Sequence, residues 1–239
     1  MALSIDKLIR RSGGNRVLNI IYHGVVEEDA TYFSPRSVEK WQFEKQMAYI
    51  KKHFDVVSVR EAFKIKEERR VVKRPTIAIS FDDGFKNNLT TALPIIERYQ
   101  LPVTFFVASA LLTEEQLPTL WSEKMAALRY FARSDSEALA TLPSDSYLKS
   151  LPPKARDSAI DQLVAEHSIE ERLKELPEEV WKLMSREELI KLSESPYVEI
   201  GSHGHLHYNL GEIPLEDAKQ DMTLSRQLIG EAIGREVEM

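Results

Sequence analysis

The strongest constraint on the fold of this chain is a strand, a helix and a second strand in close succession. Thr76–Phe81 (TIAISF) is rich in β-branched and aromatic residues and ends at Asp82-Asp83-Gly84, whose glycine suits a sharp turn. The spacing predicts a helix over Asn88–Tyr99 and then a strand over Val103–Ala108 (VTFFVA). Strands that alternate with helices in this way are typical of a parallel sheet with helices outside it.

The same alternation extends to both sides of this segment. Val17–Val25 (VLNIIYHGV) is a near-continuous apolar run, which predicts a parallel strand that is buried on both faces. Tyr197–Ser202 (YVEIGS) predicts a late strand. The remaining elements are a short strand at Asp55–Val59 and helices at Trp41–His53, Val59–Glu67 and Pro214–Ile233. Together these patterns predict an α/β fold with about five strands.

A long stretch between the strands has a different composition. Residues from about 110 to 195 hold many Glu, Lys, Leu and Ala residues and little strand signal. Helices are predicted at Trp121–Ala132, at Lys154–Glu166 and after Ser185, where Ser185 and Glu188 form a capping box. We interpret this stretch as a helical insertion within a single domain that covers residues 1–239.

Two adjacent carboxylates, Asp82 and Asp83, follow the strand Thr76–Phe81. Because side chains alternate along a strand, Asp82 shares a face with Ser80, at the carboxyl end where ligands bind in α/β folds. Neighbouring carboxylates repel each other unless a cation is present. A helix N-cap or an Asp-Gly turn is the alternative interpretation of this pair.

Three of the six histidines, His203, His205 and His207, fall within five residues after the strand Tyr197–Ser202. Neutral imidazole is the commonest metal ligand in proteins. His203 and His207 face one point if the chain turns at Gly204, whereas His203 and His205 would pair across an extended segment. An exposed His-rich loop without a metal is the alternative interpretation.

Together, the two clusters predict a hydrolytic metal site. One carboxylate and two imidazoles around a divalent ion leave coordination positions open for water, whose pKa falls toward ~7 at a catalytic zinc. A second carboxylate can accept the proton that such a water loses, so Asp82 and Asp83 suit these two roles. The chain has no cysteine, so any metal must take His, Asp, Glu or water ligands. Zinc is the expected ion, with cobalt and nickel as alternatives.

These residues resemble the motifs of a known family. Ser80-Phe81-Asp82-Asp83-Gly84 resembles the TFDDG motif of the NodB-type polysaccharide deacetylases, which form carbohydrate esterase family 4. His203-Gly-His-Leu-His207 resembles their H-[ST]-x-x-H motif, with Gly204 in place of Ser or Thr. The resemblance implies that Asp82 is the catalytic base and that Asp83, His203 and His207 are metal ligands, with His205 outside the ligand set.

The resemblance also implies a fold and an activity. The expected fold is a distorted (β/α) barrel, and the expected reaction is the metal-dependent removal of acetyl groups from a polysaccharide or amino sugar, at a carbon–nitrogen or ester bond. The run Ile20–Val25 is similar to the family's first strand, so the likeness covers roughly residues 17–239. His23 lies at the end of this run and is either a structural histidine or a substrate-binding residue.

The later motifs of the family have no match in this chain. The resemblance implies a motif similar to R-x-P-[YF]-G beyond Arg235 and a late histidine that acts as general acid. We therefore expect an incomplete barrel that lacks its C-terminal part. A non-catalytic metal- or glycan-binding remnant of the same family is the alternative hypothesis. The open sheet edges of such a barrel could pair with a second copy, which predicts a homo-oligomer.

Charge and hydrophobicity exclude other classes of protein. The net charge of −6 argues against nucleic-acid binding, which usually requires a basic excess. The N-terminus, MALSIDKLIRRSGGNR, lacks the apolar stretch of a secretory signal, and the longest nearly apolar run, Leu101–Leu112, is too short to span a membrane. The sequence thus predicts a cytoplasmic protein, and the family resemblance implies that its partner is an acetylated carbohydrate.

Overall fold

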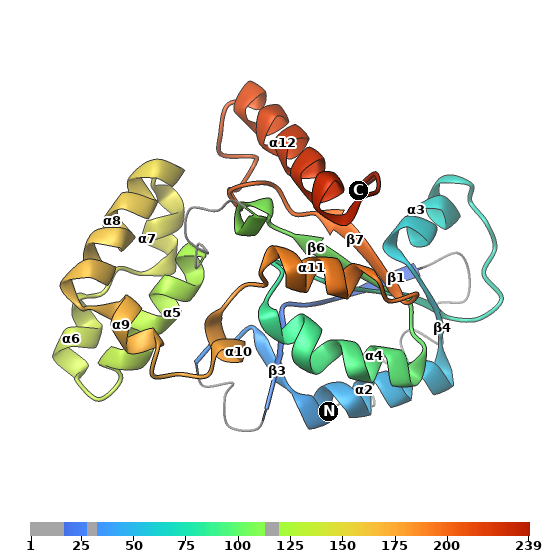
Figure 1. The fold of residues 1–239 in the computed structure, drawn as a ribbon, viewed down its shortest axis with the longest axis horizontal. Helices are drawn as coiled ribbons and strands as arrows, with labels where there is room; N and C mark the ends of the chain where they lie inside the picture. The colour runs from blue at the N-terminus through green and yellow to red at the C-terminus, as the bar shows by residue number, and fades with distance from the viewer. Residues whose placement is uncertain (1–16, 28–32, 113–119) are drawn as a thin grey trace.

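A parallel sheet forms the centre of the computed structural model, which describes residues 17–27, 33–112 and 120–239. Its five strands are β1 (Val17–Tyr22), β4 (Asp55–Val57), β5 (Thr76–Phe81), β6 (Val103–Val107) and β7 (Val198–Ser202). The order is β1-β5-β6-β7, and β4 also pairs with β5. β1 pairs with β5 over the whole strand, while β4 and β6 pair with the start and the end of β5 (Figure 1). The predicted α/β fold with a parallel sheet is confirmed.

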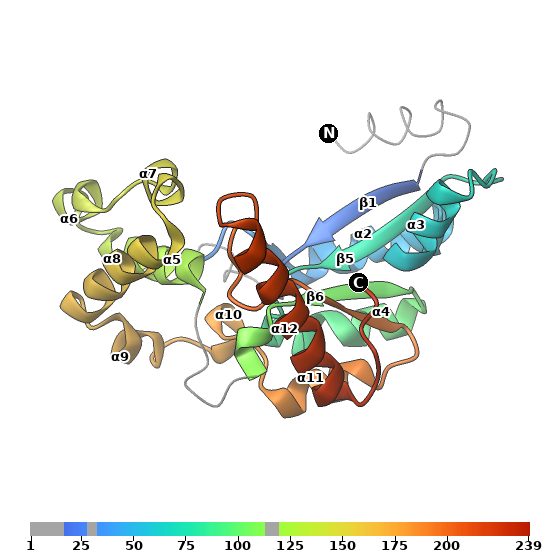
Figure 2. The ribbon, with the colours of Figure 1, turned by 90° about the horizontal axis from the view of Figure 1, so that it is seen from above.

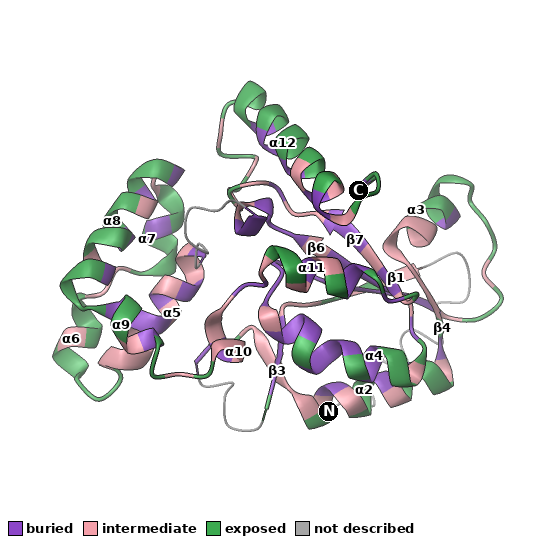
Figure 3. Cartoon of the chain, in the orientation of Figure 1, coloured by how far each residue is buried: buried purple, intermediate pink, exposed green. Residues whose placement is uncertain are grey.

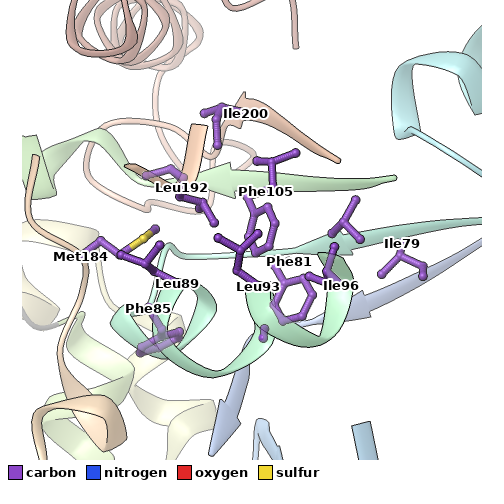
Figure 4. Packing of buried hydrophobic residues seen from close by; sticks show 14 of the residues in the cluster. Ile79, Phe81, Phe85, Leu89, Leu93, Ile96, Phe105, Met184, Leu192 and Ile200 are labelled. Atoms are coloured by element: carbon purple, nitrogen blue, oxygen red, sulfur yellow. The ribbon is translucent and has the colours of Figure 1, made fainter. Parts of the chain in front are cut away.

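Helices cover the sheet and share one hydrophobic cluster with it. α2 (Lys40–His53), α4 (Leu93–Tyr99) and α11 (Arg186–Ser193) lie in a row along one side of the sheet (Figures 1 and 2). The rings of Phe81 and Phe105, from β5 and β6, stack with centroids 4.8 Å apart at the centre of this cluster (Figure 4). Aliphatic side chains of the helices surround the two rings, and they include Leu93, Ile96 and Leu192.

Several helix boundaries agree with the local sequence signals. α3 (Val59–Glu67) begins after Ser58, whose hydroxyl accepts the Glu61 N–H, and α5 spans Trp121–Ala132 as predicted. The Ser185 capping box is present at the start of α11. α12 (Leu215–Ile233), the last helix along the chain, packs against β7 and α11.

The helical insertion has a hydrophobic cluster of its own. The insertion consists of α5, α6 (Ser136–Thr141), α7 (Asp145–Ser150), α8 (Pro153–Glu166), α9 (Ile169–Leu173) and α10 (Glu178–Trp181). Helices α5 to α9 form a group at one end of the molecule, beside the sheet (Figures 1 and 2). Buried residues are concentrated on β5, β6, β7 and α4, whereas α6 and α8 are mostly exposed (Figure 3). α11, which the composition groups with the insertion, packs on the sheet through Leu189 and Leu192.

The first strand differs from its prediction. The run Val17–Val25 breaks at His23, and the short strand β2 (Gly24–Val26) pairs with β3 (Ser37–Glu39) in a separate two-stranded sheet. β1 is only partly buried, and Ile21 is 54% exposed. The prediction of one strand buried on both faces is therefore wrong. The break has a long-range cause, because the Val25 N–H donates to the Asn87 side chain rather than to a neighbouring strand (3.1 Å).

Two further elements differ in detail from their predictions. The strand predicted at Asp55–Val59 ends at Val57, because Ser58 caps α3. The helix predicted over Asn88–Tyr99 is present, but it begins with a π-helical turn, η1 (Asn88–Ala92).

Within the described residues, no helix has the length and hydrophobicity needed to cross a membrane.

Candidate metal centre

Asp83 lies in a tight turn at the carboxyl end of β5. Asp83 and Gly84 both have positive φ angles, 77° and 92°, a conformation that costs free energy for a residue other than glycine. Three segments hold this turn: Asp82 N–H donates to Tyr22 O (2.9 Å), Ala108 N–H to Asp83 O (3.3 Å) and Met184 N–H to Gly84 O (3.0 Å). The Asp83 side chain is completely buried as a result.

The histidines lie in a loop at the carboxyl end of β7. The His203 N–H donates to Val107 O (2.9 Å), which aligns the start of this loop with the end of β6. Gly204 and His207 then adopt positive φ angles of 79° and 55°. The chain therefore turns between the two histidines rather than staying extended.

This turn brings Asp83, His203 and His207 together. Asp83 Oδ1 lies 3.0 Å from His207 Nε2 and 3.5 Å from His203 Nε2. Each of the three residues offers a ligand atom within 4.8 Å of the others. His205 lies outside this group, and its Nδ1 contacts the Ser109 hydroxyl at 2.9 Å.

The donor set fits a divalent ion. Metal–ligand bonds of ~2.0–2.1 Å in tetrahedral zinc sites separate neighbouring donor atoms by about 3.3 Å, and the two oxygen–nitrogen distances bracket this value. Asp83 Oδ1 is buried and makes no contact with hydrogen-bond geometry among the described residues. A buried carboxylate oxygen that faces two imidazole nitrogens is a suitable metal ligand.

The second oxygen of Asp83 faces a cation. Arg36 Nη1 lies 3.4 Å from Asp83 Oδ2. Arg36 Nη2 donates a hydrogen bond to the Ser122 hydroxyl (2.9 Å) and forms an ion pair with Glu123, which is fully buried. Burial alone would raise the pKa of Asp83, but the close imidazoles of His203 and His207 and the Arg36 guanidinium hold it well below its usual range. Asp83 is thus ionised, as a metal ligand must be.

Asp82 and His23 lie beside the three clustered residues. Burial raises the pKa of Asp82, and the imidazoles of His203 and His23 oppose this shift. Burial likewise lowers the pKa of His23, against the charges of Asp83 and Asp82. Burial would lower the pKa of His203, but its contact with Asp83 raises it. A carboxylate with a raised pKa is a better proton acceptor than an exposed one.

The sequence interpretation missed the residues that support this site. Asp221 of α12 accepts the N–H groups of His205 (2.7 Å) and Leu206 (3.0 Å), and Ser225 donates to Gly204 O (2.8 Å). Arg36, Glu123 and these two α12 residues belong to no local motif. Because these residues lie far along the chain from the residues that they support, no sequence pattern indicates that they contact the site.

Gly204, the departure from the H-[ST]-x-x-H pattern, has a structural reason. A Cβ at this position would lie 2.7 Å from Asp221 Oδ1, and the φ angle of 79° is itself unfavourable for other residues. The carboxylate of Asp221 thus occupies the space in which a side chain at position 204 would lie.

Sequence comparison identifies the family. The profile of the polysaccharide deacetylase family matches residues 69–239, which include the Asp82-Asp83 turn, the insertion and the histidine loop. This chain belongs to the polysaccharide deacetylase family. Among curated proteins, none matches the sequence significantly.

Several solved structures share this fold. IcaB from Ammonifex degensii superposes with a TM-score of 0.58 at 15% identity, over 94% of this chain and 72% of that one. The deacetylase PplD of Streptococcus pyogenes, in complex with acetate, gives 0.57 at 11% identity, over 92% and 70%. A de-N-acetylase from Aggregatibacter actinomycetemcomitans gives 0.55 at 17% identity, over 92% and 76%. The arrangement of strands and helices is therefore that of the NodB-type deacetylases.

A cavity of about 550 Å³ opens beside the histidines and has a size typical of ligand sites. Its lining includes His203 and His207 of the histidine loop and Trp121 and Arg156 of the insertion. A molecule in this cavity would therefore contact both the candidate metal ligands and the insertion.

Proposed function

We propose that this protein is a metal-dependent hydrolase that removes acetyl groups from a polysaccharide or amino sugar, at a carbon–nitrogen bond or an ester bond. The observation that carries the proposal is the convergence of Asp83, His203 and His207 within 4.8 Å, with Asp82 beside them. Membership of the polysaccharide deacetylase family supports the same substrate class.

In this proposal Asp83, His203 and His207 hold a divalent ion, with zinc as the first choice and cobalt or nickel as alternatives. When bound, such an ion polarises an acyl carbonyl and lowers the pKa of a nearby water. The Arg36 guanidinium stabilises the ionised form of Asp83 and fixes the direction of its second oxygen. The ligand oxygen thus stays directed at the two imidazoles.

Asp82 is the proposed general base. It would accept a proton from the water that attacks the acetyl carbonyl, because burial raises its pKa and makes the carboxylate more basic. His23 is the proposed substrate-binding residue beside it. Its lowered pKa keeps the imidazole neutral, so that it can donate or accept a hydrogen bond with a sugar hydroxyl or acetyl group.

The test measures zinc binding and acetate release separately, in matched variants. Asp82→Asn should keep zinc affinity but lower acetate release from acetylated chito-oligosaccharides about 10²–10⁴-fold, because only the proton acceptor is lost. Asp83→Asn should lower zinc affinity as well. Asp55→Asn, an exposed carboxylate at the amino end of β4, is the control and should change neither quantity.

Two outcomes would contradict the proposal. Full activity of Asp82→Asn would show that another group accepts the proton. A wild-type chain that binds zinc and saccharide yet releases no acetate under any metal would be a binding protein rather than an enzyme.

A further inference from the structure

The helical insertion carries a buried cation that the proposed chemistry does not use. Arg156 of α8 is 4% exposed, and its guanidinium lies 4.7 Å from the centroid of the Trp121 ring. Its Nε donates to Asp157 Oδ1 (2.9 Å). Its Nη2 is buried and has no hydrogen-bond partner among the described residues. Leaving a donor of a buried charged group unpaired is costly, so this group has a strong tendency to bind an anion.

Arg156 lines the same cavity as the histidines. The Trp121 ring restrains the guanidinium by a cation–π contact, and the Tyr208 ring lies 5.9 Å from it on the side of the histidine loop. A guanidinium held in one orientation binds carboxylate or phosphate oxygens through paired N–H groups. The cavity is therefore lined both by this guanidinium and by two of the candidate metal ligands, His203 and His207.

The lining of this cavity contains more basic than acidic side chains. Lys149, Arg156 and Arg226 line it, and Glu212 is the single acidic side chain among its described lining residues. Arg226 pairs with Glu236 and Arg156 with Asp157, two carboxylates outside the lining. The whole chain has a net charge of −6. Lys149 is exposed and makes no ion pair within the described residues, so it is available to a ligand. An anion in the cavity is therefore attracted chiefly by Lys149 and by the unpaired Nη2 of Arg156.

We propose that the substrate is an acetylated saccharide that carries an anionic group, a carboxylate or a phosphate, and that Arg156 and Lys149 bind this group. The inference rests on the proposed function, because it places the acetyl group of the same molecule at His203 and His207. The neutral part of the sugar then spans the cavity between the histidine loop and the insertion. The insertion thereby selects the substrate, while the carboxyl ends of the strands carry the chemistry.

The first experiment compares probes on the unmodified protein. Binding of N-acetylglucosamine, N-acetylglucosamine 1-phosphate and N-acetylmuramic acid is measured by calorimetry at low and at physiological salt. We expect at least one anionic probe to bind about tenfold or more tightly than the neutral sugar, as one charge-assisted pair of hydrogen bonds would provide. The anionic probe that binds more tightly than the neutral sugar shows whether the group is a phosphate or a carboxylate. Equal affinity for all three would overturn the proposal.

The second experiment locates the preference. Arg156→Gln should abolish the higher affinity for the anionic probe, and Arg156→Lys should keep part of it. Lys149→Gln should reduce this affinity ratio about two- to threefold. Lys154→Gln, on the same helix but outside the cavity, is the control and should leave it unchanged. A preference that persists in Arg156→Gln would show that the anion binds elsewhere, for example at the metal, and would overturn the proposal. If Arg156→Gln does not fold, Lys149→Gln and the probe comparison decide.

Acetate release separates the two proposals. Equal release from neutral and anionic saccharides would refute the anionic substrate and leave the deacetylase activity standing. Arg156-dependent binding without acetate release would refute the activity and leave the binding site standing.

Discussion

The loop between the two candidate histidine ligands depends on one carboxylate, and its removal gives the sharpest structural prediction. Asp221 is 8% exposed and accepts two consecutive backbone N–H groups, from His205 at 2.7 Å and from Leu206 at 3.0 Å. In Asp221→Ala both donors lose their acceptor. A buried donor left unpaired costs about 1–3 kcal/mol.

The exposure of the loop sets the expected size of the loss. Leu206 is 45% exposed, so water can replace the carboxylate at its N–H, and this loss should stay near the lower end, about 1 kcal/mol. The partly buried His205 N–H should contribute about 1–2 kcal/mol. We therefore expect Asp221→Ala to lower the free energy of unfolding by about 2–3 kcal/mol and to weaken zinc binding about 10–100-fold, as loss of an outer-shell partner does.

Urea unfolding of the metal-free protein and competition with a chromogenic chelator measure these two quantities. Asp221→Asn retains one acceptor oxygen and should lie between the wild type and the alanine variant. Asp217→Ala is the control, because this residue is exposed one turn earlier on the same helix, and its effect should stay within about 0.5 kcal/mol. Unchanged zinc affinity in a stably folded Asp221→Ala would refute the view that this carboxylate positions the ligands.

Three further predictions concern the same site. Gly204→Ala should cost about 1–3 kcal/mol of stability, because it combines a positive φ angle with a clash, whereas Gly211→Ala, which has space for a methyl group, should cost less than about 0.5 kcal/mol in the same urea assay. Arg36→Met should lower the unfolding free energy by about 3–5 kcal/mol, since it leaves the buried carboxylates of Asp83 and Glu123 without their cation, and a second change, Glu123→Gln, should restore part of it. The pKa of Asp83 is lower in the folded metal-free protein than in the unfolded chain, so ionised Asp83 stabilises the fold above about pH 4, and this stabilisation is lost as the pH falls further. In Asp83→Asn, the free energy of unfolding should therefore depend less on pH below about pH 4 than in the wild type.

Elements with a strong local pattern could be predicted from the sequence. The strand Thr76–Phe81 and the helices Val59–Glu67 and Trp121–Ala132 have the expected boundaries, because their periodicity and capping residues are local properties. The run Val17–Val25 could not be predicted correctly. Its break at His23 depends on β3 and on Asn87, which lies 62 residues from Val25 along the chain.

The candidate metal ligands could be predicted for a similar reason. Asp83 and His203 lie just after the carboxyl ends of β5 and β7 in one parallel sheet, and such strand ends meet at the same edge. The turn that selects His207 over His205 depends on contacts of the loop with α12, which no local pattern encodes. Arg36 and Arg156 are single basic residues in ordinary surroundings, so only the folded chain shows that they lie beside Asp83 and the histidine loop.

The two hydrophobic clusters explain why these arginines matter. Apolar burial stabilises the sheet and the insertion through two clusters, and Phe33, from the segment before β3, is the residue outside the insertion that joins the second one. Non-directional contacts of this kind do not by themselves fix the position of the insertion relative to the metal ligands. Arg36 supplies a directional link, since it pairs with Glu123 of α5 and with Asp83 after β5. Arg156 supplies another, because it lies over Trp121 of α5 and faces Tyr208, the residue after His207. The insertion is thus linked to the Asp83 turn through Arg36 and contacts the histidine loop through Arg156. Under the proposed anion site, a change at Arg156 would alter substrate preference without altering the residues proposed to hold the metal.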